Sequence, residues 1–509
     1  VRCHSSGTSP RQSPSPSHNK QAAGKVSASA SAPASTSASA SASESDLVSH
    51  HLAAAPTSPT TPTTLATMPP RVPIPPLSIL PLTSIVRSLV ITTISSTRLL
   101  TPSLAALSII AHAQGPILSP ERNRYLRYLI KKTIYKQFCA GENDAEVKQT
   151  VNGLLKLGYK GVILGYAKEV VMNESQAGKL NESHAGKLES SGDNDAAKAC
   201  IRNEINPWAQ GTLRTVQMTS PGDFVGLKFT GAGSQALFDL SKKTGPSAAL
   251  KEAIDSICDL AAARDVRLLF DAEQQAVQAG IDAWTLRYMR EYNGKTPGKA
   301  VVYGTYQAYL KATPSILASH LAAARKDGFT LGVKLVRGAY LGSDPRHLIH
   351  DTKAETDDCY DSISASLARR SYGSVLKPAP GETEFPPVDV VLAGHNHTSV
   401  RKIRALRDEQ AKNGGEQIDL VYAQLQGMAD EVSCDLVLAG RVNAGETKVD
   451  IPKAYKYLVW GTTGECMKYL LRRAQENKDA AQRTRDGRKA HGKELRRRIK
   501  AVFGFGPRF

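Results

Sequence analysis

The sequence predicts an α/β protein built around a (β/α)8 barrel. Short runs rich in Val, Ile, Leu and Tyr recur between residues 158 and 478, and a stretch with helical spacing follows each of them. Such runs are typical of parallel strands that are buried on both faces. There are eight of them, the number that closes this barrel, and a zone of roughly 320 residues suits it. A doubly wound open sheet is the alternative architecture.

The expected strands follow one another in chain order at 161–166, 223–230, 266–273, 300–307, 331–340, 388–396, 419–428 and 454–462. One long interruption, residues 173–198, separates the first two strands. It contains the near-duplicates NESQAGKL and NESHAGKL and shows no apolar periodicity, so we expect a solvated insertion.

The first 70 residues are expected to be disordered. As far as Ser43 they are mainly Ser, Ala, Pro and Thr with scattered Arg and Lys, and no acid precedes Glu44. Such a segment cannot offset its ordering entropy, and its composition is typical of an organelle transit peptide. A disordered tail without a targeting role is the alternative. Residues 71–157 are expected to form helices that pack on the barrel.

Residues 72–115 are apolar enough to be tested as a membrane span. The uncharged run between Arg87 and Arg98 has only ten residues, and Pro81 and Pro102 interrupt the segment further. A spanning helix needs roughly 20 apolar residues. We therefore expect short helices that pack on a soluble domain or lie at a membrane surface.

The net charge of +18 is unevenly distributed, because residues 472–509 hold 13 Lys/Arg against four acids. We expect the basic tail, residues 479–509, to be a solvated helix with paired charges, ahead of a segment that binds an anionic membrane. Nucleic acid is disfavoured because no aromatic residues are interleaved with the charges. The seven cysteines are odd in number and form no C-x-x-C pair, which fits a reducing compartment such as the mitochondrial matrix.

Polar residues gather at the expected carboxyl ends of the strands, where barrels of this kind bind their ligands. Any one of these residues, taken singly, is as readily explained by a structural role as by a functional one. The cations among them, however, should all lie at the same open end of the barrel, its mouth. They are Lys228, Lys334, Arg337, Arg472 and Arg473. A mouth of this charge suits a phosphorylated cofactor together with a carboxylate substrate.

Two other motifs are weaker. Residues 231–236, GAGSQA, match the G-x-G-x-x-A loop of dinucleotide-binding folds, but the acids that follow, such as Asp255, fall in a helical pattern. A tight turn is therefore preferred over an NAD site. His395 and His397 are two residues apart, yet we expect no metal site, and no serine or cysteine nucleophile motif is present.

Four segments resemble the barrel motifs of the proline dehydrogenase family. They are VKLVRGAY (333–340), GHNH (394–397), QLQGM (424–428) and YLVWGTTGECMKYLLRRAQEN (457–477). The resemblance covers about residues 120–500 and is strongest to fungal mitochondrial members. It implies a distorted barrel with non-covalent FAD that oxidises L-proline to pyrroline-5-carboxylate. It also implies electron transfer to a membrane quinone, with contact at the matrix side of the mitochondrial inner membrane.

The resemblance also implies roles for individual residues. The substrate carboxylate would be bound by Lys228, Arg472 and Arg473, and the pocket would be shaped by Asp271, Tyr340, Leu425, Tyr457 and Tyr469. The FAD would be lined by Lys334, Val336, Arg337, Gly338, Ala339, His395, Asn396, Gln424 and Glu476. Two positions depart from the family pattern. Lys334 stands where bacterial members commonly have Arg, and Gly304 stands where a side-chain amide is frequent, which leaves the role of Gln307 open.

Three other functions remain open on the sequence. One is a hydroxyproline dehydrogenase of the same superfamily, although a residue smaller than Tyr457 would better accommodate the ring hydroxyl. Another is a catalytically inactive barrel that binds proline, against which the filled carboxylate positions count. The last is an NAD-linked barrel enzyme.

Overall fold

The computed structural model describes residues 74–113, 115–168, 194–444, 448–479 and 481–504. The expected transit-like segment and most of the expected insertion lie outside these residues. Residues 194–198, the end of that insertion, begin helix α8 (Asn194–Cys200).

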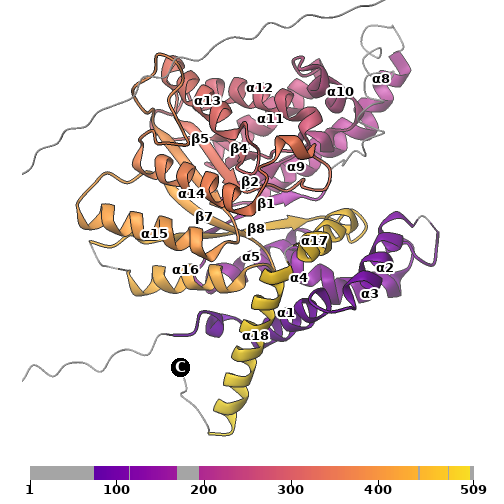
Figure 1. Ribbon diagram of the computed structural model, residues 1–509. Coiled ribbons are helices and arrows are strands. Elements are labelled where there is room, and N and C mark those ends of the chain that lie inside the picture. Colours follow the sequence, from indigo (N-terminus) through magenta and orange to yellow (C-terminus); the bar gives the residue numbers. More distant parts are fainter. Residues whose placement is uncertain (1–73, 114, 169–193, 445–447, 480, 505–509) are drawn as a thin grey trace, which may run out of the picture. The chain divides into compact units, whose positions relative to one another are not determined.

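Eight parallel strands close a barrel in chain order, and β1 pairs with β8 (Figure 1). The strands are β1 (Gly161–Tyr166), β2 (Phe224–Leu227), β3 (Arg267–Phe270), β4 (Val302–Gln307), β5 (Leu331–Val336), β6 (Val388–Ala393), β7 (Leu420–Leu425) and β8 (Lys453–Trp460). Every expected strand is present, and each lies inside its predicted range except β8, which begins one residue earlier. The predicted barrel is confirmed, and the open-sheet alternative is wrong.

Helices form the outer layer. They are α9 (Asn206–Met218), α10 (Ser234–Lys242), α11 (Ala248–Ala263), α12 (Gln275–Tyr292), α13 (Thr313–Asp327), α14 (Lys353–Arg369), α15 (His397–Lys412), α16 (Asp430–Val442) and α17 (Met467–Asp479), with the short η4 (Ile201–Ile205), η5 (Phe229–Ala232) and η6 (Arg346–Leu348). The main apolar core lies between this layer and the outward strand faces. A smaller cluster that includes Ile163, Phe224, Leu269, Tyr303 and Tyr455 fills the barrel interior.

Further helices precede the barrel. They are η1 (Pro76–Ile79), α1 (Leu82–Ser95), α2 (Leu100–His112), α3 (Arg124–Ile130), η2 (Lys131–Tyr135), α4 (Lys136–Phe138) and α5 (Asp144–Lys156). Among the described residues, no single helix is long and apolar enough to cross a membrane. Helices α1 and α2 reach that composition only as a pair, and they are bent by 101° at their junction.

The basic tail forms helix α18 (Ala481–Val502), which lies along α1 (Figure 1). The Arg498 guanidinium donates to the carbonyl oxygens of Leu77, Ser78 and Leu80 at 2.8–3.2 Å. Glu494 pairs with Arg497 and Arg498. The expected helix and its paired charges are present. The helix is nevertheless not solvated all round, because Glu494 is buried where α18 meets η1 and α1.

Candidate active site

Four polar residues lie at one level across neighbouring strands of the barrel. Leu227 pairs with Phe270, Phe270 with Gly304, and Thr305 with Lys334. The residues after the first pair, Lys228 and Asp271, therefore continue the level of Thr305 and Lys334. Since side chains alternate along a strand, all four face the lumen at the carboxyl end of the barrel.

Asp271 is the centre of this group. Its carboxylate lies 3.0 Å from Lys228 Nζ and 2.5 Å from Lys334 Nζ, and it accepts a hydrogen bond of 2.9 Å from the Tyr457 hydroxyl. Burial alone would raise the pKa of Asp271, but the ammonium groups of Lys228 and Lys334 hold it well below its usual value. Burial lowers the pKa of Lys334, and the Asp271 carboxylate opposes that shift. The group is therefore a buried network in which one ionised carboxylate is shared by two lysines.

Tyr457 forms one wall of the lumen because two glycines leave room for it. A Cβ at Gly226 would overlap the Tyr457 hydroxyl, and a Cβ at Gly165 would crowd it. The Lys334 ammonium lies 5.1 Å from the centre of the Tyr457 ring. Burial, followed by the charge of Asp271, raises the pKa of Tyr457 well above its ordinary value. The phenol is therefore a neutral donor.

Helix α17 brings two arginines to the same mouth. The Arg473 guanidinium lies 4.9 Å from the centre of the Tyr469 ring, one helical turn away. The Arg472 guanidinium lies 6.0 Å from the ring of Tyr340, which follows β5. These contacts place both cations beside aromatic faces that orient them. Glu476 lies in α17, but its side chain is outside the described residues.

The segment after β5 holds a second group of predicted residues. Arg337 donates from Nε and Nη2 to Asp357 at 3.1 and 2.9 Å, and Asn396 donates to the same carboxylate at 3.4 Å. Asn396 also caps α15 by accepting the amides of residues 398 and 399. Gly338 has a φ of 154° and packs against the Tyr309 ring, which a Cβ would overlap. The ends of β5 and β6 are thus tied together.

His395 and Gln424 behave differently from each other. His395 Nε2 accepts the Leu425 amide at 3.2 Å, so its proton resides on Nδ1. Gln424 donates to the Gly394 carbonyl and accepts from Ser433 of α16, so it points away from the lumen and supports the end of β7. Val336 ends β5 beside Gln307, and Leu425 reaches the cluster around Tyr469.

Gln307 is a site residue to which the sequence assigned no role. Its Oε1 accepts the Ala339 amide at 3.2 Å, while its buried Nε2 has no partner among the described residues. It shares the lumen face of β4 with Thr305, two residues earlier. Gly304 faces the other way, because a Cβ there would meet Thr285 and Met289 of α12. Gly304 therefore does not line the lumen, and strand parity is the signal that would have favoured Gln307.

The dinucleotide-like loop is a structural turn. Gly231 and Ala232 lie in η5, and Gly233, with a φ of 95°, begins α10. The Glu204 carboxylate accepts the Ser234 amide at 2.6 Å and thus fills the start of this helix. A pyrophosphate would need that position, so the turn is preferred over the NAD site here as well.

His395 and His397 do not act together, since His397 lies 3.6 Å from Asp435 on the outer layer. Within the described part of the chain, no group of three His, Cys, Asp or Glu side chains is arranged for a metal ion.

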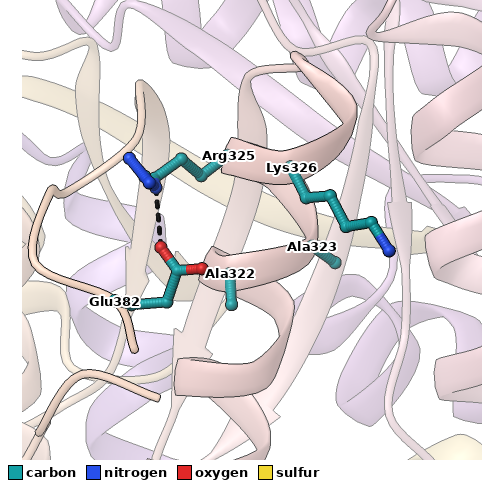
Figure 2. A pocket seen from close by; sticks show the side chains of 5 residues that line it. All are labelled: Ala322, Ala323, Arg325, Lys326 and Glu382. Carbon is teal, nitrogen blue, oxygen red and sulfur yellow. Dashed lines mark hydrogen bonds and ion pairs between the residues drawn. The ribbon is translucent and has the colours of Figure 1, made fainter. Parts of the chain in front are cut away.

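A surface hollow on α13 is separate from this mouth. Ala322, Ala323, Arg325, Lys326 and Glu382 line it (Figure 2). Arg325 Nε and Glu382 are paired at 2.6 Å. These residues of α13 lie toward its end, which leads into the start of β5. The hollow is therefore at the opposite end of the barrel, and its Arg325 is already paired with Glu382 and Glu384.

Comparison with known proteins shows the family. The sequence profile described as "Proline dehydrogenase" matches residues 147–486. The "Probable proline dehydrogenase, mitochondrial" of Schizosaccharomyces pombe is 29% identical over 415 residues, covering 74% of this chain and 81% of the relative. The "Hydroxyproline dehydrogenase" of Mus musculus is 27% identical over 396 residues, covering 73% of this chain and 83% of the relative.

A solved structure supports the fold. Proline utilization A from Bdellovibrio bacteriovorus, inactivated by N-propargylglycine, superposes with a TM-score of 0.53 at 16% identity. The match covers 76% of this chain and 38% of that protein, so this chain spans about two fifths of its length. At this identity the likeness concerns the barrel alone.

Proposed function

Because the chain belongs to the proline dehydrogenase family, we propose that it oxidises L-proline to pyrroline-5-carboxylate, with FAD as cofactor and a membrane quinone as electron acceptor. The proposal is supported chiefly by Lys228, which pairs with Asp271 in the lumen beside Tyr457. Helix α17 adds Arg472 beside Tyr340 and Arg473 beside Tyr469. This mouth combines cations for a carboxylate with a closed, partly aromatic interior.

The residues at the ends of β4 and β5 suit FAD. Gln307 Nε2 and Arg337 Nη1 are buried donors without a partner among the described residues, and both belong to strand ends at this mouth. Leaving a buried donor unpaired costs about 1–3 kcal/mol, so a ligand with carbonyl and phosphate oxygens would stabilise both. Lys334, Val336, Gly338, Ala339, His395 and Asn396 would complete the cofactor site, together with Glu476 of α17. Gln424 would support it from behind.

The chain's own contribution is to bind and orient proline. Arg472 and Arg473 would grip the carboxylate, with Lys228 as a third cation, and thereby fix the ring in the lumen. FAD, when bound, supplies the hydride acceptor. Asp271 is held ionised by its three donors, so it is a poor proton acceptor, and proline must arrive as the neutral amine. The apolar and aromatic walls favour that form and exclude water.

The relatives' names also bear on location. The proteins of Schizosaccharomyces pombe, Caenorhabditis elegans and Dictyostelium discoideum are named mitochondrial. We place this chain in the mitochondrion too, at the matrix side of the inner membrane, where a quinone is available.

An anaerobic titration tests the proposal. Purified protein should show flavin absorbance bands that proline bleaches and that a quinone restores. A spectrum without flavin bands, or bands that proline leaves unchanged, would reject the proposal and favour an inactive proline-binding barrel. Reduction of NAD by proline without quinone or dye would instead support an NAD-linked enzyme.

Hydroxyproline is the alternative substrate, because some relatives carry that name. Tyr457 counts against it, since the ring fills the space between Gly165 and Gly226. Turnover of both substrates by the same preparation decides the matter, and a preference for hydroxyproline would reverse the assignment.

A further inference from the structure

Helix α3 exposes an apolar stripe that no described part of the chain covers. Tyr125, Tyr128 and Leu129 are 80%, 65% and 60% exposed. With Lys132 in η2 they follow the helical spacing i, i+3, i+4 and i+7, so they share one face.

The opposite face of α3 is firmly attached to the protein. Arg127 and Lys131 bind Glu142 at 3.0 and 2.6 Å, and Glu142 accepts from Thr463 in the turn between β8 and α17. Ile130 is buried in the cluster that contains Tyr469 and Leu470 of α17. The helix therefore has a protein-facing side, and the exposed stripe is a second, separate apolar side.

Further exposed apolar side chains precede the stripe in the chain. The Asn123 side chain donates to the Ile117 carbonyl at 2.7 Å and folds the preceding turn back against the start of α3. Ile117 is 73% exposed in this turn. Leu99, directly before α2, and Ile109 of α2 are exposed as well. The inner residues Leu107 and Ile110 of α2 join the same cluster as Ile130. We call these seven side chains the α2–α3 face: Leu99, Ile109, Ile117, Leu118, Tyr125, Tyr128 and Leu129.

The charge around the α2–α3 face is almost entirely positive. Between residues 72 and 141 the only acid is Glu121. In the described part of the chain, no carboxylate lies within ion-pairing distance of five exposed cations: Arg98, Arg122, Arg124, Lys132 and Lys136. Arg124 lies 5.8 Å from the Tyr125 ring centre, and Lys132 lies 5.6 Å from that of Tyr128.

We propose that the α2–α3 face is the surface by which this protein docks on an anionic lipid bilayer. Tyrosines with an apolar body and a polar tip, interleaved with Arg and Lys, form the composition that lies at a headgroup boundary. Unpaired cations complement anionic lipid headgroups.

The position of the α2–α3 face relates docking to electron transfer, and this step of the inference rests on the proposed function. Helix α2 packs on α17, which carries Arg472 and Arg473 at the barrel mouth, and Ile130 of α3 belongs to the same apolar cluster. A bilayer on the α2–α3 face would thus lie beside the mouth from which electrons must pass to a lipid-soluble quinone.

Vesicle flotation of the full chain tests the proposal. Vesicles of neutral phosphatidylcholine are compared with vesicles that also contain anionic cardiolipin. The wild type should bind the anionic vesicles, more weakly at high salt. The variant Tyr125→Ser/Tyr128→Ser/Leu129→Ser should bind at least about tenfold more weakly. Arg124→Gln/Lys132→Gln should lose about fivefold for each cation removed.

The matched control is Leu155→Ser/Val442→Ser/Ile451→Ser, three exposed apolar residues at the other end of the barrel, which should bind like the wild type. A wild type that does not bind, or face variants that bind as well as the control, would overturn the proposal. Equal binding to neutral vesicles would also do so. If the triple variant instead lowers the molecular mass in solution, the face is a contact between copies.

Turnover of proline with a water-soluble dye separates this proposal from the proposed function. If the wild type oxidises proline with the dye but does not bind vesicles, the docking surface alone is overturned. Vesicle binding without any dye-linked activity leaves the docking surface supported and rejects the enzyme assignment. The charge variant, which removes no apolar contact, keeps the test valid if the triple variant does not fold.

Discussion

Lys334 and Asp271 form an ion pair that crosses an entire strand. Their Nζ and Oδ1 atoms are 2.5 Å apart, although Asp271 follows β3 and Lys334 belongs to β5. Thr305 of β4 lies between them at the same level. A small residue at this position leaves the lumen open for the pair, so the site depends on three strands at once.

Asp271→Ala should destabilise the protein strongly. The change would leave the ammonium groups of Lys228 and Lys334 close together without a counter-charge, and breaking a buried pair in this way costs about 3–5 kcal/mol. Urea unfolding measures the loss. Asp351→Ala, which breaks the exposed pair with Lys311, is the control and should cost at most about 1 kcal/mol. Equal losses in the two variants would show that the Asp271 network is not buried in solution.

Thr305 should be sensitive to size and not to polarity. Thr305→Leu places extra carbons where the ion pair crosses and should cost about 1–3 kcal/mol, with a loss of proline turnover. Thr305→Val keeps the shape and removes a buried hydroxyl that has no partner among the described residues, so it should be neutral or slightly stabilising. Thermal unfolding compares the two. A valine variant as unstable as the leucine variant would contradict this prediction.

Arg473→Ala should raise the KM for proline about 10- to 150-fold, because one charge-assisted contact to a carboxylate is worth about 1.5–3 kcal/mol. Steady-state kinetics with a soluble dye measures it. Arg473→Lys should be intermediate, since an ammonium cannot form the two-pronged contact. The control is Arg214→Ala, which removes an exposed arginine paired with Asp144. An unchanged KM in Arg473→Ala would remove Arg473 from the substrate site.

Tyr457→Ser should shift the substrate preference toward hydroxyproline. The ring fills the lumen between Gly165 and Gly226, and its removal opens room for a ring hydroxyl. We expect the ratio of kcat/KM for hydroxyproline over proline to rise about tenfold or more. Tyr457→Phe keeps the volume and loses only the hydrogen bond to Asp271, so it serves as the matched variant with an unchanged ratio. A rise in both variants would show that the hydroxyl, not the volume, excludes hydroxyproline.

The strands could be predicted because buried parallel strands produce dense apolar runs that differ from their helical connectors. The shared level of Lys228 and Asp271 in the barrel could also be predicted, because both residues lie near the carboxyl ends of predicted strands. The direction of each side chain could not be predicted with the same accuracy. A shift of one residue in the strand moves a side chain from the lumen to the outer face. For this reason the sequence left the role of Gln307 open and did not show that Gly304 faces away from the lumen.

Helix α18 was harder to place for a different reason. Its sequence is so polar that composition alone favours full solvation, and only the tertiary contacts reveal that His491 and Glu494 are buried. Burial of these polar side chains depends on partners distant in sequence, such as Asp430 for His491. The contact between Lys334 and Asp271 likewise requires the closed barrel, because β4 separates the two strands.

The pairing of His491 with Asp430 should make stability depend on pH. His491 Nε2 lies 3.8 Å from the Asp430 carboxylate, which Lys456 also contacts at 3.1 Å. Burial alone would lower the pKa of His491, but Asp430 raises it above its usual value. Lys456 and His491 hold the pKa of Asp430 well below its ordinary value against the effect of burial, so Asp430 stays ionised near neutral pH.

A raised pKa in the folded state means that protonated His491 stabilises the fold. This contribution is complete below the unfolded pKa of about 6.5 and is lost as the pH rises through the folded value. The free energy of unfolding of the wild type should therefore fall on passing from pH 6 toward alkaline pH, and His491→Gln should flatten this slope. Urea unfolding at several pH values measures it, with His347→Gln, an exposed histidine of η6, as control. An unchanged slope in His491→Gln would show that α18 is held to α16 by its other contacts alone.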